Sequence, residues 1–202
     1  MSTGTESSAA AAGLRGVVAA QSAIGDVNGE EGKLIYQGYD IHDLAEHSTF
    51  EEVVFLLWNG RLPSQAELDE HISTLRSNYS APHEVIDLMK QYPKDSDPMD
   101  ILRTAVSSLD LYDPKGQGTD RESAVGAAVR ITARIGTIAA AWERIRNGKD
   151  VVAPDPSLSI AENFLYMLRG EKPEADEARM FDIALILHAD HELNASTFTT
   201  RV

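Results

Sequence analysis

The chain has 202 residues, of which 25% are charged and 43% hydrophobic, as in an ordinary soluble globular domain. Its net charge of −14 disfavours nucleic acid and anionic membranes as partners, because both repel an acidic surface. Without cysteine it forms no disulfide, thiolate metal site or cysteine nucleophile. No basic and apolar leader opens the chain and no uninterrupted apolar stretch approaches about 20 residues, so we expect a cytoplasmic protein.

The first forty residues predict a tail followed by a small hairpin. Residues 1–12 are mostly Ser, Thr, Gly and Ala, which bury little apolar area, so we expect a disordered tail. The β-prone stretches Gly16–Ala19 and Lys33–Tyr36 flank a turn-rich segment around Gly25–Gly29. This arrangement indicates a β-hairpin.

From Ile41 onward the spacing of apolar residues is helical. A helix is predicted over Phe50–Trp58, ended by Asn59-Gly60, and a capping box at Ser64–Glu67 opens the next one, which runs to about Tyr79. Further helices are predicted over 82–91, 97–112, 121–146 and 160–168, and a final one ends at 187. The fold class is therefore all-α, mostly helical with a small β-hairpin near the N-terminus.

The helix predicted over Arg121–Arg146 is rich in alanine and glycine. Small side chains let another backbone approach closely, so this helix is either a tightly packed core helix or one that packs against its copy in a dimer. In the second case, we expect Gly136 to lie in the dimer interface. Arg130 and Arg134 interrupt the helix and argue against a membrane span.

The residues most suggestive of a functional site follow the last predicted helix. His188 and His191 share a helix face at i and i+3, and Asn194, Ser196 and Thr197 come directly after them. A metal site would need a third ligand, and the spacing does not match the zinc-protease motif. The histidines could be purely structural, with Asn194 and Ser196 as caps of a bend. Alternatively, imidazole, amide and hydroxyl groups together suit a small, oxygen-rich anion.

Several segments together resemble the citrate synthase family of bacterial and archaeal type. The stretch 187–197, Leu-His-Ala-Asp-His-Glu-Leu-Asn-Ala-Ser-Thr, resembles its signature segment, and further similar stretches occur in the family's order at 13–19, 34–41, 49–63 and 97–106. The resemblance covers nearly all of the chain after the tail. One departure is Gln37, where the family often has arginine.

This resemblance implies an all-α homodimer, or a hexamer of dimers, whose subunits have a large and a small domain. Residues 13–202 would be the N-terminal part of the large domain, truncated before the small domain. The reaction implied is the condensation of acetyl-CoA with oxaloacetate to citrate and CoA, the entry to the tricarboxylic acid cycle. It uses no metal and no cofactor.

By the same resemblance, His191 binds oxaloacetate, His188 supports the site and Asn194 supports the local turn. Ser196 would orient the histidine that stabilises the enol of acetyl-CoA. In the family, the catalytic histidines, the catalytic carboxylate and the substrate-binding arginines lie further along the chain. They are therefore expected downstream of Val202, and none is expected in this chain. The remaining histidines match no catalytic position: His42, His47, His71 and His83.

Two other functions remain open from the sequence. The chain could belong to a 2-methylcitrate synthase, which uses propionyl-CoA, or it could be a non-catalytic helical module that dimerises. The isolated 202-residue polypeptide is expected to be inactive, because the groups that abstract the proton and bind most of the substrate are not expected in it.

Overall fold

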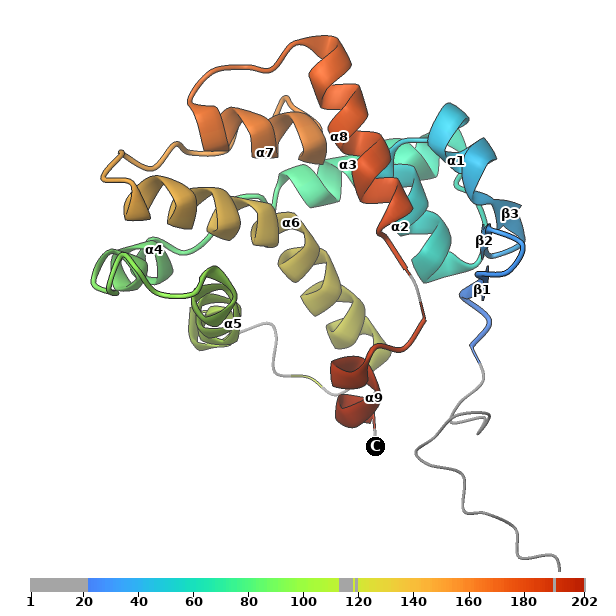
Figure 1. The fold of residues 1–202 in the computed structure, drawn as a ribbon, viewed down its shortest axis with the longest axis horizontal. Helices are drawn as coiled ribbons and strands as arrows, with labels where there is room; N and C mark the ends of the chain where they lie inside the picture. Colours follow the sequence, from blue (N-terminus) through green and yellow to red (C-terminus); the bar gives the residue numbers. More distant parts are fainter. Residues whose placement is uncertain (1–21, 113–117, 119, 191, 202) are drawn as a thin grey trace, which may run out of the picture.

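The computed structural model describes residues 22–112, 118, 120–190 and 192–201. Their helices are arranged around one long helix, and a small sheet lies at one end (Figure 1). The prediction of a mostly helical protein is confirmed. The tail predicted over residues 1–12 lies outside the described residues, as do residues 13–21, 113–117 and 119, His191 and Val202.

The sheet has three short antiparallel strands in the order β1-β2-β3: Gly25–Asn28, Lys33–Tyr36 and Tyr39–Asp40. Gly25 pairs with Tyr36, and Asn28 pairs with Lys33. The predicted hairpin is present, with Gly25–Asn28, the segment expected to be the turn, as the strand that pairs with β2. The stretch Gly16–Ala19, expected as its first strand, lies outside the described residues. The actual turn is tighter and lies at residues 29–32, where the Asn28 side chain accepts the amides of Glu30 and Glu31.

The helices α1 to α5 follow the sheet. They span Ile41–His47, Phe50–Asn59, Gln65–Arg76, His83–Lys90 and Pro98–Leu109. A 3-10 turn at Asp110–Tyr112 extends α5. The predicted caps are present: Ser64 and Glu67 form a capping box, and Gly60 ends α2 in the left-handed conformation that favours glycine. In addition, the Thr49 hydroxyl caps the start of α2 by accepting the amide of Glu52.

The second half consists of α6 (Arg121–Arg146), α7 (Ile160–Arg169), α8 (Ala175–Leu187) and α9 (Ala195–Arg201). Ser159 and Glu162 cap α7 and Gly170 ends it. The short α9 was not expected from the sequence, because its residues, Ala-Ser-Thr-Phe-Thr-Thr-Arg, show no helical hydrophobic pattern.

Besides a small buried cluster of Leu75, Tyr79 and Ala133 between the end of α3 and α6, two larger buried clusters hold these elements together. One joins α4, α5 and the second half of α6: Val85, Met89, Ile101, Ala105, Leu109, Ile138, Ala141, Trp142 and Ile145. The other joins the sheet, α1, α2 and α8: Tyr36, Ile41, Leu44, Val53, Leu56 and Ile186. The second cluster matters most here, since it fixes the end of α8 against the sheet.

The helix α6 packs against α3, α4, α5 and α7. By length and composition alone it could also cross a membrane, since an 18-residue window has a mean hydropathy of 1.3 even with its arginines. A core helix meets the same criterion, and α6 packs against four helices, with 33% of that window buried.

Candidate functional site

The predicted site residues lie where α8 ends and α9 begins. His188 is the C-cap of α8, and its ring nitrogen Nδ1 lies 2.7 Å from the carbonyl oxygen of Ala184. Because a carbonyl can only accept, Nδ1 carries the proton in this contact. The Nε2 atom lies on the other side of the ring, and His188 is exposed.

Asn194 begins α9. Its side-chain oxygen Oδ1 accepts the amide of Thr197 at 2.8 Å, and its carbonyl accepts the amide of Phe198 at 2.9 Å. In the structure Asn194 is therefore a helix cap. Ser196 lies one position into α9 and is exposed, with its carbonyl accepting the Thr200 hydroxyl. The placement of His191 is outside the described residues.

A hollow of about 330 Å³ lies beside this segment, lined by Ser22, Ile24, His188, Ala189, Asp190, Glu192, Leu193, Asn194 and Thr197. It brings His188 and Asn194 together, whereas Ser196 is not part of its lining. Its charged groups are the carboxylates of Asp190 and Glu192, and no Lys or Arg is among these lining residues. A dicarboxylate would therefore need cations from elsewhere to bind here.

A residue that the sequence analysis did not single out holds this segment in place. The Tyr36 hydroxyl lies 2.9 Å from the carbonyl oxygen of Asp190 and 3.2 Å from that of Ile186, and it accepts the Asp190 amide at 3.1 Å. Burial raises the pKa of Tyr36, so the hydroxyl stays protonated. The only sequence signal is its place in the stretch that resembles the family at 34–41.

The position of α8 is set by a second contact between distant segments. The Arg179 guanidinium donates to the carbonyls of Ala45, Glu46 and Ser48, where α1 ends, and pairs with Asp182 at 2.8 Å. The other oxygen of Asp182 accepts the amide of Phe50, the first residue of α2, at 3.0 Å. Burial raises the pKa of Asp182. Together these contacts tie α8 to α1 and α2.

The other histidines do not border the hollow. His42 contacts Asp40 at 2.9 Å, His83 contacts Glu84 at 3.3 Å, and His47 lies 4.0 Å from Glu46, all on the surface. The His71 ring packs edge-on against the rings of Phe55 and Trp58, and burial lowers its pKa. These contacts are structural.

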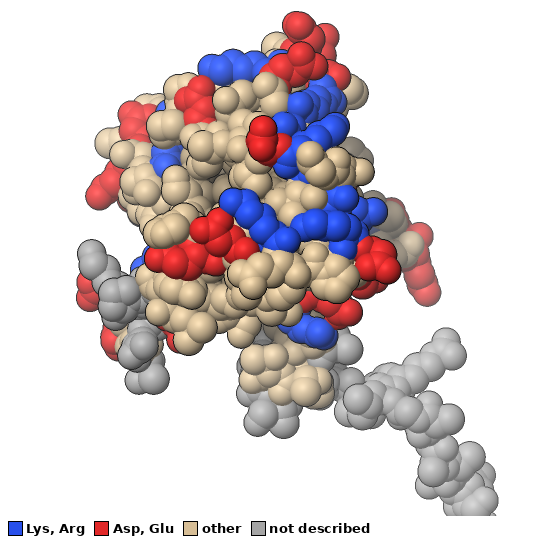
Figure 2. Space-filling model, turned by 90° about the vertical axis from the view of Figure 1, so that its left-hand side faces the viewer, with Lys and Arg blue, Asp and Glu red and all other residues tan. Residues whose placement is uncertain are grey.

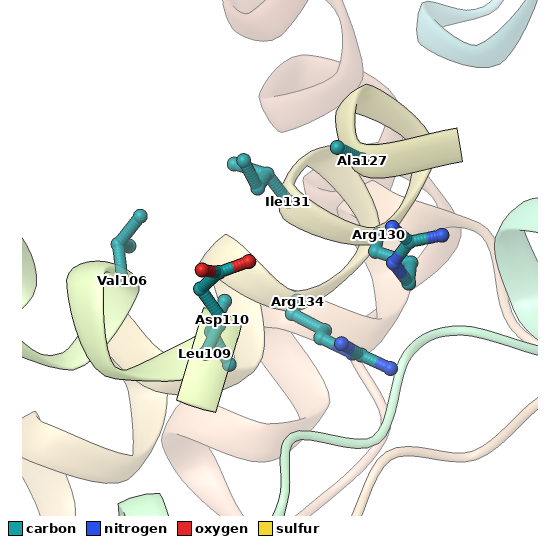
Figure 3. A pocket seen from close by; sticks show the side chains of 7 residues that line it. All are labelled: Val106, Leu109, Asp110, Ala127, Arg130, Ile131 and Arg134. Atoms are coloured by element: carbon teal, nitrogen blue, oxygen red, sulfur yellow. The ribbon is translucent and has the colours of Figure 1, made fainter. Parts of the chain in front are cut away.

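Other hollows lie away from the α8–α9 segment. Figure 3 shows one of about 70 Å³ between α5 and α6, where the Arg130 and Arg134 side chains extend away from Val106 and Ile131. The Arg134 Nε donates to the carbonyl of Ser80 at 3.1 Å. This arginine therefore joins α6 to the segment before α4.

Another hollow, of about 420 Å³, is lined by Lys90, Lys94, Lys149 and neighbours at the ends of α4 and α6. Figure 2 shows Lys and Arg side chains gathered across this side of the molecule. Lys90 pairs with Asp87 at 2.8 Å, and the Lys94 ammonium donates to the carbonyl of Lys90. Cations at helix C-termini complement the helix dipole, which accounts for this cluster.

The chain is similar to known proteins over nearly its whole length. A family model described as "Citrate synthase, C-terminal domain" matches residues 13–202. A curated citrate synthase of Haloferax volcanii is 46% identical over 94% of this chain and 51% of its own length. A 2-methylcitrate synthase of Corynebacterium glutamicum is 41% identical over the same shares.

A solved structure supports the same relationship. The citrate synthase of Pyrobaculum aerophilum aligns with a TM-score of 0.87 and 36% identity, over 92% of this chain and 48% of that one. The chain thus spans about half the length of the relatives that it matches.

Proposed function

Because the chain belongs to the citrate synthase family, we propose that it forms the oxaloacetate-binding part of an enzyme that condenses acetyl-CoA with oxaloacetate to citrate and CoA. The observation that carries the proposal is the 46% identity to the Haloferax volcanii citrate synthase over 94% of the chain. We retain the proposal that residues 13–202 are the N-terminal part of the large domain.

The proposed roles follow the resemblance. His191 donates a hydrogen bond to the oxaloacetate carbonyl, which gains negative charge as the new carbon–carbon bond forms. His188 supports the site, Asn194 holds the turn before α9, and Ser196 orients the enol-stabilising histidine. The structure supports the role of Asn194 through its cap of α9. It supports His188 through the Ala184 contact, which holds the Nδ1 side of the ring.

We assign none of the catalytic groups to this chain. In the family's reaction a carboxylate takes the α-proton of acetyl-CoA while a histidine stabilises the enol. In this proposal, the carboxylate and the enol-stabilising histidine both come from sequence downstream of Val202. Val202 itself lies outside the described residues. The hollow at the start of α9 is lined by carboxylates and no Lys or Arg, so we propose that the oxaloacetate-binding arginines come from outside it. No metal or other cofactor takes part in the proposed reaction.

The similarity to 2-methylcitrate synthases keeps propionyl-CoA as an alternative substrate, at 41% identity against 46% for a citrate synthase. A non-catalytic dimerising module is the second alternative. We further propose a cytoplasmic homodimer, or a hexamer of dimers, with α6 in the two-fold interface. Val125, Ile131 and Ile135 on α6 are each more than 40% exposed, which supports that interface.

The test is the release of CoA thiol from acetyl-CoA with oxaloacetate present, measured in the complete protein, with propionyl-CoA in parallel. We expect a higher kcat/KM for acetyl-CoA. His191→Ala should lower kcat/KM for oxaloacetate about 10²- to 10³-fold, as for loss of a charge-assisted donor. His42→Ala, which changes an exposed histidine, is the matched control.

EDTA should have no effect, and the 202-residue polypeptide alone should match a blank without enzyme. Higher kcat/KM for propionyl-CoA would favour a 2-methylcitrate synthase. No turnover with either thioester would favour the non-catalytic module. Wild-type kinetics in His191→Ala would contradict its role.

A further inference from the structure

The sheet contacts the candidate site through one fully buried side chain. Tyr36 is the last residue of β2, and its exposed fraction is 0%. Its ring packs in the cluster with Ile41, Leu44 and Ile186, which holds the hydroxyl beside the end of α8. The hydroxyl thus reaches residues 150 and 154 positions further along the chain.

The hydroxyl contacts backbone groups at the end of α8 and just after it. Asp190 follows α8, and both its amide and its carbonyl bond the Tyr36 oxygen, at 3.1 and 2.9 Å. The carbonyl of Ile186, in the last turn of α8, lies 3.2 Å from the same oxygen. The single proton of the hydroxyl is shared between the two carbonyls, with Asp190 the nearer, and one lone pair accepts the Asp190 amide. The Tyr36 oxygen thus contacts both ends of the turn from Ile186 to Asp190, which contains His188.

A second contact from the sheet acts on the same residue. A Cβ atom at Gly25 would lie 2.9 Å from the Asp190 carboxylate oxygen Oδ2 and 3.2 Å from the carbonyl of Ile35. That carboxylate oxygen accepts the amide of Glu192, which has a left-handed φ of 70°. The sheet therefore constrains Asp190 from two sides, and Asp190 constrains the turn that leads to Asn194.

We propose that Tyr36 is a positioning residue, whose hydroxyl fixes the backbone from Ile186 to Asp190 and so places His188, Ala189 and Asp190, which line the hollow at the start of α9. The identity of the ligand, oxaloacetate, rests on the proposed function. The fixed backbone course does not, since it depends only on contacts between described residues.

The first measurement is hydrogen–deuterium exchange of backbone amides in the complete protein, for wild type and Tyr36→Phe. Loss of the hydroxyl leaves the Asp190 amide without its acceptor, so exchange across residues 187–194 should be about tenfold or more faster. Tyr79→Phe is the matched control: Tyr79 is 3% exposed and its hydroxyl bonds the carbonyl of Leu158, remote in sequence from this segment. The control should leave exchange at 187–194 unchanged.

The second measurement separates positioning from loss of stability. Tyr36→Phe should raise KM for oxaloacetate about tenfold or more with a smaller change in kcat, whereas Tyr79→Phe, with a comparable loss of Tm, should not. Gly25→Ala, which keeps the hydroxyl but displaces Asp190, should act in the same direction.

Unchanged exchange at 187–194 in Tyr36→Phe, or an equal increase in Tyr79→Phe, would overturn the proposal. An unchanged KM for oxaloacetate in both Tyr36→Phe and Gly25→Ala would overturn it as well. If wild type shows no turnover with oxaloacetate, the proposed function fails, and the exchange measurement still decides whether Tyr36 fixes the segment.

Discussion

Glu51 is a buried carboxylate that joins two helices. It lies in the first turn of α2, is 3% exposed, and accepts the amide of Ile160, the first residue of α7, at 2.7 Å. Burial raises the pKa of Glu51 above its usual 4.5, and the nearby Asp182 carboxylate adds to this effect. The folded state therefore holds the Glu51 proton more tightly than the unfolded state does.

The sign of the pH effect follows from that difference. A raised carboxyl pKa contributes stability below the unfolded pKa of about 4.5, and this contribution is lost as the pH rises through the folded value. Glu51→Gln keeps an acceptor for the Ile160 amide but removes the charge. We expect this variant to gain stability relative to wild type between pH 4 and pH 8.

Urea midpoints measured at intervals from pH 4 to pH 8 check this expectation. Glu70→Gln removes an exposed carboxylate in α3 and should show no comparable gain. A Glu51→Gln variant that becomes less stable than wild type as the pH rises would show that the Glu51 charge is stabilising.

At the scale of elements, α8 depends on Arg179. Its guanidinium satisfies three carbonyls at the end of α1, which helix geometry leaves without partners, and also pairs with Asp182. Arg179→Met should lower the free energy of unfolding by about 1–2 kcal/mol, at the low end for charged donors because 37% of the side chain is exposed.

Urea denaturation measures this loss. Arg179→Lys should recover only part of it, since a single ammonium cannot reach several carbonyls as the planar guanidinium does. Arg103→Met is the control, because the Arg103 side chain is 77% exposed and pairs with Asp100 in the same helix. Equal losses for Arg179→Met and Arg103→Met would mean that the α1 contacts contribute little.

At the scale of the whole molecule, the burial of α6 residues within the chain determines which of them are accessible to a dimer partner. The small residues mostly serve the chain's own packing: Ala133, Ala140 and Ala141 are buried, and a Cβ at Gly136 would lie 3.6 Å from the Phe164 ring of α7. Gly136 was expected at the dimer contact, but it faces α7. The exposed apolar residues on α6 are Val125, Ile131 and Ile135.

Ile131→Asp and Ile135→Asp should therefore weaken a two-fold dimer, and each substitution counts twice in such an interface. From the burial of an isoleucine side chain we expect the dissociation constant to rise at least about 100-fold. Sedimentation of the complete protein measures it. Val27→Asp, at a similarly exposed apolar residue of β1, is the control, and a dimer unchanged by both α6 variants would place the interface elsewhere.

The helices and most of their ends follow from local sequence. Ser64 with Glu67, Ser159 with Glu162, and Gly60 and Gly170 satisfy or end helices through contacts within a few residues, which a sequence displays directly. The predicted ends therefore differ from the observed ones by at most a few residues.

The tertiary structure decided what depends on contacts between distant segments. Three such features involve residues whose local patterns fit more than one partner. They are the pairing of β2 with Gly25–Asn28, the burial of Tyr36 against Asp190, and the face of α6 that is turned toward α7. The sequence alone determined that His188 and Asn194 lie near each other, because they are six positions apart at a helix end. Only the folded chain determined that a tyrosine 154 residues away holds that segment, since a hydroxyl's partner is set by packing and leaves no local pattern.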